Sequence, residues 1–310
     1  MQIKITAQKI GFLLKETFRG FMADKAIKLS AALSYYTIFS LPPLLIIIVA
    51  ICGFFFGAEA VRGEIFWQIK EIVGNNAALH IQDTIKEVSI SESNAFAAII
   101  GGVALVIGAS GVFSEIQDSL NFIWGIEAKP KRGIIKFLIN RLTSFSMIGS
   151  LGFLLMVGLV VNSLIDVLGD RLALRYPKDA VYLFYVVNII ILFIIITLLF
   201  TFIFKTLPDG KLVLRDCLIG ASFTAFLFMI GKFIIGAYLS SSAFISVYGA
   251  TGTAIVILVW IYYSAAILYF GAEFTKVYAH THGAKITPNE YSVIVAKAKT
   301  GIAPDINPQR

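Results

Sequence analysis

Hydrophobic residues run in six long stretches along the chain, separated by segments that carry most of the charge. Crossing a hydrocarbon core of about 30 Å takes about 20 helical residues, and each stretch is close to that length or longer. The pattern therefore predicts an all-α, polytopic membrane protein with six transmembrane helices. The predicted spans are Leu29–Phe56, Ala95–Phe113, Ser144–Val167, Val181–Phe204, Asp216–Leu239 and Tyr248–Phe270.

The first 28 residues have a different pattern, in which apolar residues recur at three- and four-residue spacing between basic ones. The apolar positions are Ile10, Leu13, Leu14, Phe18, Phe21 and Met22. This spacing predicts an amphipathic helix that lies on the cytoplasmic membrane face and favours anionic headgroups. The loop between the first two spans carries shorter stripes of the same kind, which predict two interfacial helices. The helical periodicity of apolar residues ends near Gly283. The expected organisation is thus a cytoplasmic helix over residues 1–28, a transmembrane domain over 29–280 and a flexible cytoplasmic tail over 281–310.

Composition agrees with a membrane location, because 58% of the 310 residues are hydrophobic and only 15% are charged. A soluble protein would carry roughly 25% charged residues. The net charge of +7 could suggest nucleic acid as a partner, but its distribution favours another explanation. Of the 26 Lys and Arg residues, 19 fall at the termini and in alternate loops, and 6 fall in the other loops. Positive residues mark the cytoplasmic side. We therefore expect both termini in the cytoplasm and no nucleic-acid partner.

Two features could interrupt the predicted spans. Pro42 and Pro43 remove backbone donors in the first span, so a kink or an unwound turn is expected there. That break could serve packing alone or could line a cavity. Gly108 and Gly111 near the end of the second span could act as a hinge, although close helix packing explains small residues equally simply.

One lysine, Lys232, lies about 16 residues into the fifth predicted span. A lysine at such depth costs on the order of 2.5–3.5 kcal/mol if it faces lipid. It could extend to the outer headgroups, or it could face the bundle interior. In the second case Asn162 and Asp166 of the third span reach a similar depth and are candidate partners.

Polar and aromatic residues gather near the inner ends of several spans. A polar inner vestibule with an aromatic wall would explain them, and so would ordinary interfacial residues that end helices. The candidate residues are Glu115, Asp118, Glu273, Tyr35, Tyr36 and Tyr262.

Three motifs occur in a fixed order along the chain: Ala32–Tyr36 with Phe39–Leu44, Gly108–Gly111 with Gln117–Gly125, and Tyr248–Gly252 with Leu258–Ser264 and Gly271–Glu273. Together they resemble the YihY/virulence-factor BrkB family of bacterial inner-membrane proteins. The resemblance implies six helices in the cytoplasmic (inner) membrane. The family was once labelled ribonuclease BN, a label now regarded as a misassignment, and its members are linked to virulence and to envelope lipid export.

The residues themselves argue against an enzyme. A ribonuclease needs a metal cluster or an acid–base pair, whereas the three histidines are scattered over a loop and the tail. We expect no cofactor and no bound metal. The leading hypothesis is a transporter that moves an amphipathic, anionic, lipid-like substrate through a cavity in the bundle. The alternative is a structural or regulatory scaffold for envelope enzymes. Membrane lipids are the expected partners, and homo-oligomerisation is left open.

Overall fold

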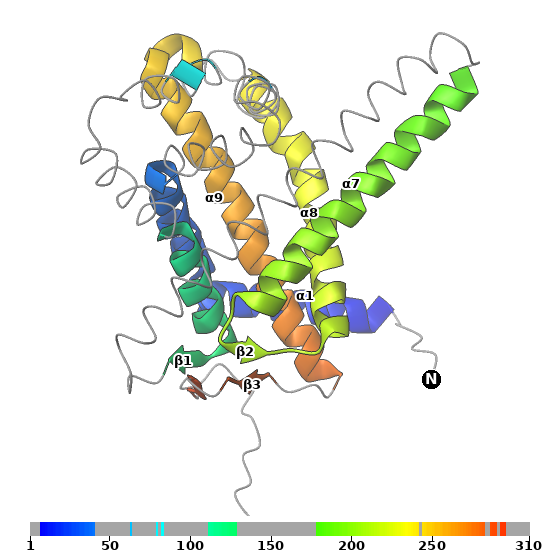
Figure 1. Cartoon of the computed structure of the whole chain (residues 1–310), viewed down its shortest axis with the longest axis vertical. Helices are drawn as coiled ribbons and strands as arrows, with labels where there is room; N and C mark the ends of the chain where they lie inside the picture. The colour runs from blue at the N-terminus through cyan, green and yellow to red at the C-terminus, as the bar shows by residue number, and fades with distance from the viewer. Residues whose placement is uncertain are drawn as a thin grey trace, which may run out of the picture.

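The computed structural model describes residues 7–40, 63, 79, 82–83, 111–128, 178–241, 244–282, 286–289 and 292–295. Within these residues the fold is helical, with two short antiparallel strand pairs at one end (Figure 1). The third predicted span and most of the first two lie outside the described residues.

Three long helices contain the apolar stretches predicted for the fourth, fifth and sixth spans. They are α7 (Lys178–Thr206), α8 (Leu214–Ser241) and α9 (Phe244–Thr281). Each is long and apolar enough to cross a membrane, over Val186–Thr206, Leu214–Ile235 and Ile255–Thr281. Helix α9 extends beyond the predicted end at Phe270, because its last three turns pack inside the protein rather than surfacing: Ala272, Thr275 and Ala279 are fully buried.

Helices α8 and α9 pack antiparallel through small residues that receive hydroxyl side chains. A methyl group on Gly220 would overlap the Thr275 hydroxyl, and one on Gly271 would overlap that of Thr224. Between these two notches the rings of Phe223 and Phe274 stack with centroids 4.0 Å apart. Small residues of this kind allow helix backbones to approach closely where hydrophobic burial gives no drive for association.

The N-terminal helix α1 (Ala7–Ala23) confirms the predicted amphipathic helix. It lies across the lower part of α9 in Figure 1. Its buried residues Leu13 and Phe21 contact α9, where Phe21 meets Phe270 edge to face. The chain then turns sharply through Lys25, whose φ of 52° is left-handed, and begins the helix over residues 26–40.

The helix over residues 26–40 stands beside the one over residues 111–124 (Figure 1). Its packed side is built from Ser30, Ser34 and Ser40, all buried. The Ser30 and Ser34 hydroxyls donate to carbonyls of the preceding turn. Gly111 lies against Ser40, where an added Cβ would sit 3.5 Å from the hydroxyl oxygen. This is an ordinary van der Waals distance, so a side chain at position 111 would meet no clash, and the choice between hinge and packing stays open.

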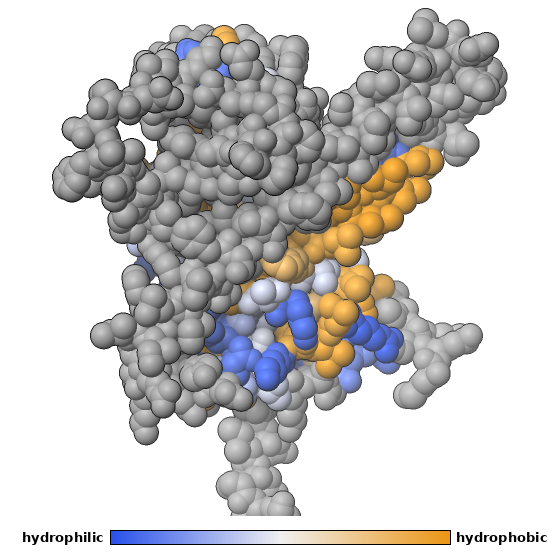
Figure 2. Space-filling model, viewed as in Figure 1, coloured by the Kyte–Doolittle hydropathy of each residue, from blue (hydrophilic) through white to orange (hydrophobic). Residues whose placement is uncertain are grey.

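The end of the bundle that carries α1 and the strands is called the polar end below. Strand β1 (Ile126–Ala128) pairs with β4 (Ser292–Ile294), and β2 (Gly210–Lys211) pairs with β3 (Thr287–Pro288). Hydrophilic residues gather at this end in Figure 2, below the apolar strip formed by α7.

Residues 286–289 and 292–295 fall in the segment expected to be a flexible tail, and for these residues that expectation is corrected. Ile286 and Ser292 are buried, and the two strands join the tail to β1 and β2. Strands of two or three residues are too short to produce a recognisable period in the sequence.

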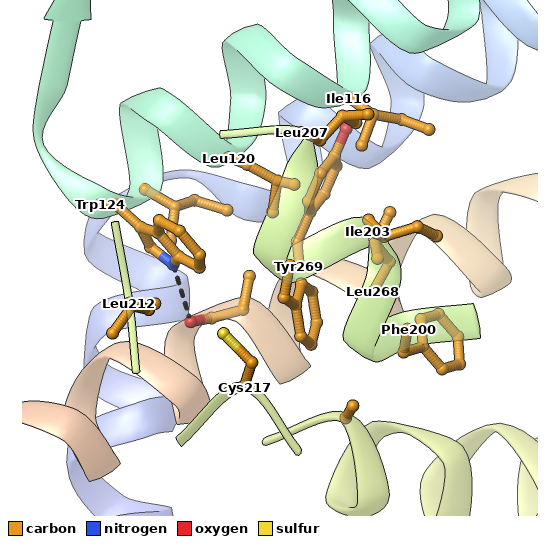
Figure 3. Packing of buried hydrophobic residues seen from close by; sticks show 14 of the residues in the cluster. Ile116, Leu120, Trp124, Phe200, Ile203, Leu207, Leu212, Cys217, Leu268 and Tyr269 are labelled. Carbon is orange, nitrogen blue, oxygen red and sulfur yellow. Dashed lines mark hydrogen bonds between the residues drawn. The ribbon is translucent and has the colours of Figure 1, made fainter. Parts of the chain in front are cut away.

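The main core lies just inside the polar end, where the helix over residues 111–124 meets α7, α8 and α9. Leu120, Phe204, Cys217 and Tyr269 are fully buried in it. Figure 3 shows Trp124 reaching into this core, with its indole Nε1 donating to the carbonyl oxygen of Ala272 at 3.2 Å. The core fixes the helix over residues 111–124 against α9 and so positions the polar groups described next.

Candidate functional site

A buried ionic cluster occupies the polar end where three segments meet. The ammonium of Lys276 on α9 lies 2.8 Å from Glu273 Oε2 and 3.3 Å from Asp24 Oδ2. It also donates to the backbone carbonyl of Ile123 at 2.8 Å. We call Asp24, Glu273, Lys276 and the Ile123 carbonyl the Lys276 cluster. One lysine thus joins α1, the helix over residues 111–124 and α9.

The surroundings of the Lys276 cluster are closely fitted. The Glu273 side chain is 0% exposed, that of Asp24 6% and that of Lys276 21%. An added Cβ on Gly20 would lie only 2.8 Å from Glu273 Oε2, so the absent side chain lets the carboxylate rest against α1. Two carboxylates share one cation that is itself hydrogen-bonded, which is the condition under which buried charges are tolerated. The arrangement holds α1 on the bundle.

A second set of polar contacts fixes the turn between α7 and α8. The Asn121 amide donates from Nδ2 to Asp209 Oδ2 at 3.0 Å and accepts from the Asp209 backbone N–H at 2.8 Å. Gln117 donates to Asp209 Oδ1 at a longer 3.4 Å. The Ser292 hydroxyl donates to the Asp209 carbonyl at 2.7 Å. We call these contacts the Asp209 clamp. It ties the turn to the helix over residues 111–124 and to the C-terminal strands.

Glu115 lies two turns before Ile123 on the same helix and is half-buried. Burial raises the pKa of its carboxyl group, and the nearby charge of Asp118 raises it further, while a hydrogen bond from Ser119 lowers it. The Ser119 hydroxyl is 3.5 Å from Glu115 Oε1. Asp118 itself is exposed. Glu115 is therefore the carboxyl group of this helix whose protonation responds most to its surroundings.

Lys232 continues a line of α8 residues that begins at buried alanines. Ala221, Ala225 and Phe228 precede it at helical spacing along one line, and the two alanines are fully buried. The Phe228 ring contacts Phe200 of α7 and Trp260 of α9. Lys232 follows one turn later and is half-buried, whereas its neighbours Phe233 and Ile234 are exposed. The partial burial of Lys232 leaves both orientations predicted from the sequence open.

The remaining predicted site residues are dispersed. Tyr35 and Tyr36 are exposed on the helix over residues 26–40, with their rings 5.9 Å apart. Tyr262 is at the border of exposed and half-buried on α9. The other candidates lie outside the described residues. They are Asn162, Asp166, Pro42, Pro43 and Gly108.

Sequence reasoning missed the partners that make these clusters. Asp24, Asn121, Asp209 and Lys276 are not among the candidate residues named from the sequence. A usable signal was present in the sequence: Gly-Ala-x-Phe-Thr occurs at 220–224 and again at 271–275. In the structure these two segments cross, and each glycine receives the other's threonine.

Among the residues that the structure describes, no group of three or more His, Cys, Asp or Glu side chains could hold a metal ion. Both carboxylates of the Lys276 cluster contact the ammonium of Lys276. What the arrangement can do chemically is to hold helices together and to present charge.

The chain has apolar helices of spanning length, a polar end and internal ion pairs. This combination is typical of an integral membrane protein. The model of the virulence factor BrkB family matches residues 17–293, and the chain belongs to this family.

Three relatives show how far this kinship extends. A UPF0761 membrane protein of Pseudomonas paraeruginosa is 28% identical over 258 residues, covering 81% of this chain and 59% of the relative. A UPF0761 membrane protein of Azotobacter vinelandii is 26% identical, covering 83% and 60%. The ribonuclease-like protein YfkH of Bacillus subtilis is 27% identical over 286 residues, covering 89% and 98%. The chain thus spans about 60% of the length of the two UPF0761 proteins. No solved structure matches it.

Proposed function

We propose that this protein is a transporter that moves an amphipathic, anionic, lipid-like substrate through its helix bundle in the bacterial inner membrane, without enzymatic activity. The observation that carries the proposal is a lysine, Lys232, that is half-buried within an apolar helix of spanning length. A cation in a low-dielectric interior attracts an anionic headgroup far more strongly than it would in water. The apolar part of such a substrate could remain in the bilayer.

The shape of the bundle around Lys232 supports this proposal. Helix α7 packs on α8 near Phe200 and leans away from it toward the upper part of Figure 1. Residues 186–198 of α7 are half-buried or exposed on nearly every face, Thr197 excepted. In the proposed mechanism the lipid-like substrate approaches from the bilayer along this exposed part of α7. The charge asymmetry of the loops favours the cytoplasm as the side of the polar end.

The test is lipid movement in reconstituted vesicles that contain fluorescent phosphatidylglycerol. Lys232→Met keeps the length of the side chain and removes its charge, so we expect transport to be lost while folding and insertion are retained. Lys232→Arg should keep part of the activity. Lys28→Met makes the same change at an exposed lysine outside the candidate spans and should leave the rate unchanged.

Two results would count against the proposal. Unchanged lipid movement in Lys232→Met would remove the lysine from the mechanism. Loss of folding in that variant would indicate a structural pair, with Asp166 or Asn162 as the first candidates.

The second candidate function, a membrane scaffold, is favoured by the Lys276 cluster and the Asp209 clamp, which tie the polar end together by direct contacts. A scaffold would show no lipid movement above that of empty vesicles.

A further inference from the structure

Helix α1 carries three lines of side chains that run along its length. The line through Leu13, Thr17 and Phe21 is buried against α9. The next line around the helix is formed by Ile10, Leu14, Phe18 and Met22, which are spaced four residues apart and all exposed. We call this second line the exposed stripe. The third line, beyond it, carries Lys15 and Arg19, which are also exposed.

The exposed stripe is large and continuous. Its four side chains are between 39% and 60% exposed, and each is apolar. A contiguous exposed apolar surface marks contact with protein or membrane. Because α9 already covers the neighbouring line, the stripe must be covered by something outside the part of the chain that the structure describes, or by the bilayer.

The position of α1 favours the bilayer. The helix lies across the lower part of α9 at the polar end, rather than alongside the candidate spans (Figure 1). A helix in this orientation, with an apolar line beside a basic line, can place the first in the acyl boundary and the second among headgroups. The only acidic residue of α1 is Glu16, against Lys9, Lys15 and Arg19. This charge favours anionic headgroups.

We propose that the exposed stripe and the adjacent basic line of α1 form a binding surface for an anionic lipid bilayer, while the opposite line docks on α9. The Lys276 cluster keeps α1 in this place, since Asp24 follows the helix directly and Gly20 contacts Glu273. The surface does not depend on the proposed transport, because it describes where α1 lies and not what the bundle moves.

The test uses the full chain in vesicles of phosphatidylcholine and phosphatidylglycerol, with Cys52 and Cys217 replaced by alanine. An environment-sensitive fluorophore is attached at Phe18→Cys, on the exposed stripe. The matched control is Phe12→Cys. Phe12 is exposed to a similar extent, 53% against 60%, but lies on the far side of the basic line. Brominated acyl chains should quench the label at position 18 at least about twofold more strongly than the label at position 12.

A second arm tests the charge. At equal mole fraction, brominated phosphatidylglycerol should quench position 18 more strongly than brominated phosphatidylcholine. The double variant Lys15→Gln, Arg19→Gln should remove this preference, because each basic side chain near the surface attracts anionic lipid.

Three outcomes would overturn the proposal. Equal quenching at positions 12 and 18 would show that the stripe has no special place in the bilayer. Protection of position 18 from aqueous iodide without quenching by brominated lipid would show that protein covers it, such as a second copy of this chain. A preference for phosphatidylglycerol that survives the double variant would show that the basic line does not select the lipid. A loss of lipid transport would not change any of these fluorescence results. The proposal for α1 and the proposed transport function can therefore be refuted independently.

Discussion

Replacing Lys276 with methionine should destabilise the protein strongly, because the substitution leaves two carboxylates in place without their cation. In the wild type, Lys276 Nζ lies 2.8 Å from Glu273, 3.3 Å from Asp24 and 2.8 Å from the Ile123 carbonyl oxygen. Methionine has a similar length and preserves the packing of the stem. The effect therefore isolates the charge and its hydrogen bonds.

The magnitude follows from the burial of the cluster. Removing one partner of a buried ion pair costs about 3–5 kcal/mol. Lys276 is 21% exposed while Glu273 is 0% exposed. Partial solvation of the lysine places the expected loss near the lower end, at about 3 kcal/mol. That value corresponds to a change of more than about 100-fold in the unfolding equilibrium.

Unfolding can be measured by titrating the detergent-solubilised protein with SDS and following its helical circular dichroism. Lys28→Met is the control, since Lys28 is exposed, and it should change the free energy of unfolding by less than about 0.5 kcal/mol. The double variant Glu273→Gln, Lys276→Met should be more stable than the sum of the two single effects predicts, by at least about 1 kcal/mol, because the amide no longer needs a cation.

The reasoning would be refuted by either of two results. A change below about 1 kcal/mol in Lys276→Met would mean that water solvates the carboxylates once the lysine is gone. Strict additivity in the double variant would mean that Glu273 and Lys276 do not depend on each other, whatever their separation.

Two further predictions concern the helix over residues 111–124. Asn121→Ala should lower the free energy of unfolding by about 2 kcal/mol, because it breaks two hydrogen bonds to Asp209. Gln117→Ala should lower it by less than about 1 kcal/mol, because the Gln117 hydrogen bond to Asp209 is long, at 3.4 Å. Equal effects of the two variants in the same SDS titration would contradict the assignment of the clamp to Asn121. In the wild type, the raised pKa means that Glu115 keeps its proton in the folded state at pH values where the unfolded state has lost it. The free energy of unfolding therefore falls as the pH rises from the ordinary glutamate pKa through the pKa of the folded state. Glu115→Gln should reduce this fall, because glutamine does not titrate. Unfolding curves of both proteins measured from pH 4.5 upward would check this, and parallel pH profiles would contradict it.

The parts of the fold that the sequence predicted are those set by local pattern. Hydrophobic length located α7, α8 and α9, and three- and four-residue spacing located α1, because both signals are contained within one helix. The six-span topology and its orientation remain predictions beyond these elements.

The contacts that join different segments in the Lys276 cluster and the Asp209 clamp could not be predicted in this way, because the partners are far apart in the sequence. Asp24 and Lys276 are separated by 252 residues, and Asn121 and Asp209 by 88. A hydropathy pattern indicates that a residue lies near the end of a helix, but it does not indicate which other helix lies beside that end. Of the contacts that the structure describes, that between the repeated Gly-Ala-x-Phe-Thr segments is the one long-range contact for which the sequence contains a signal. Their small residues lie on two consecutive helices, α8 and α9, and small residues favour close packing of helices. Glu273 occupies the variable position of the second segment and Ser222 that of the first.

Two lysines within the apolar helices, Lys232 and Lys276, have opposite explanations. Either would cost a few kcal/mol in contact with lipid. For Lys276 the cost is offset by two carboxylates and a carbonyl, so the fold alone accounts for it. For Lys232, the described part of the chain contains no ion pair, although the side chain is half-buried. Among the described residues nothing neutralises this cation, and in the proposed transporter it binds the anionic substrate. Comparing the two methionine variants therefore separates structure from function: Lys276→Met should lower stability, whereas Lys232→Met should lower transport and leave stability equal or higher.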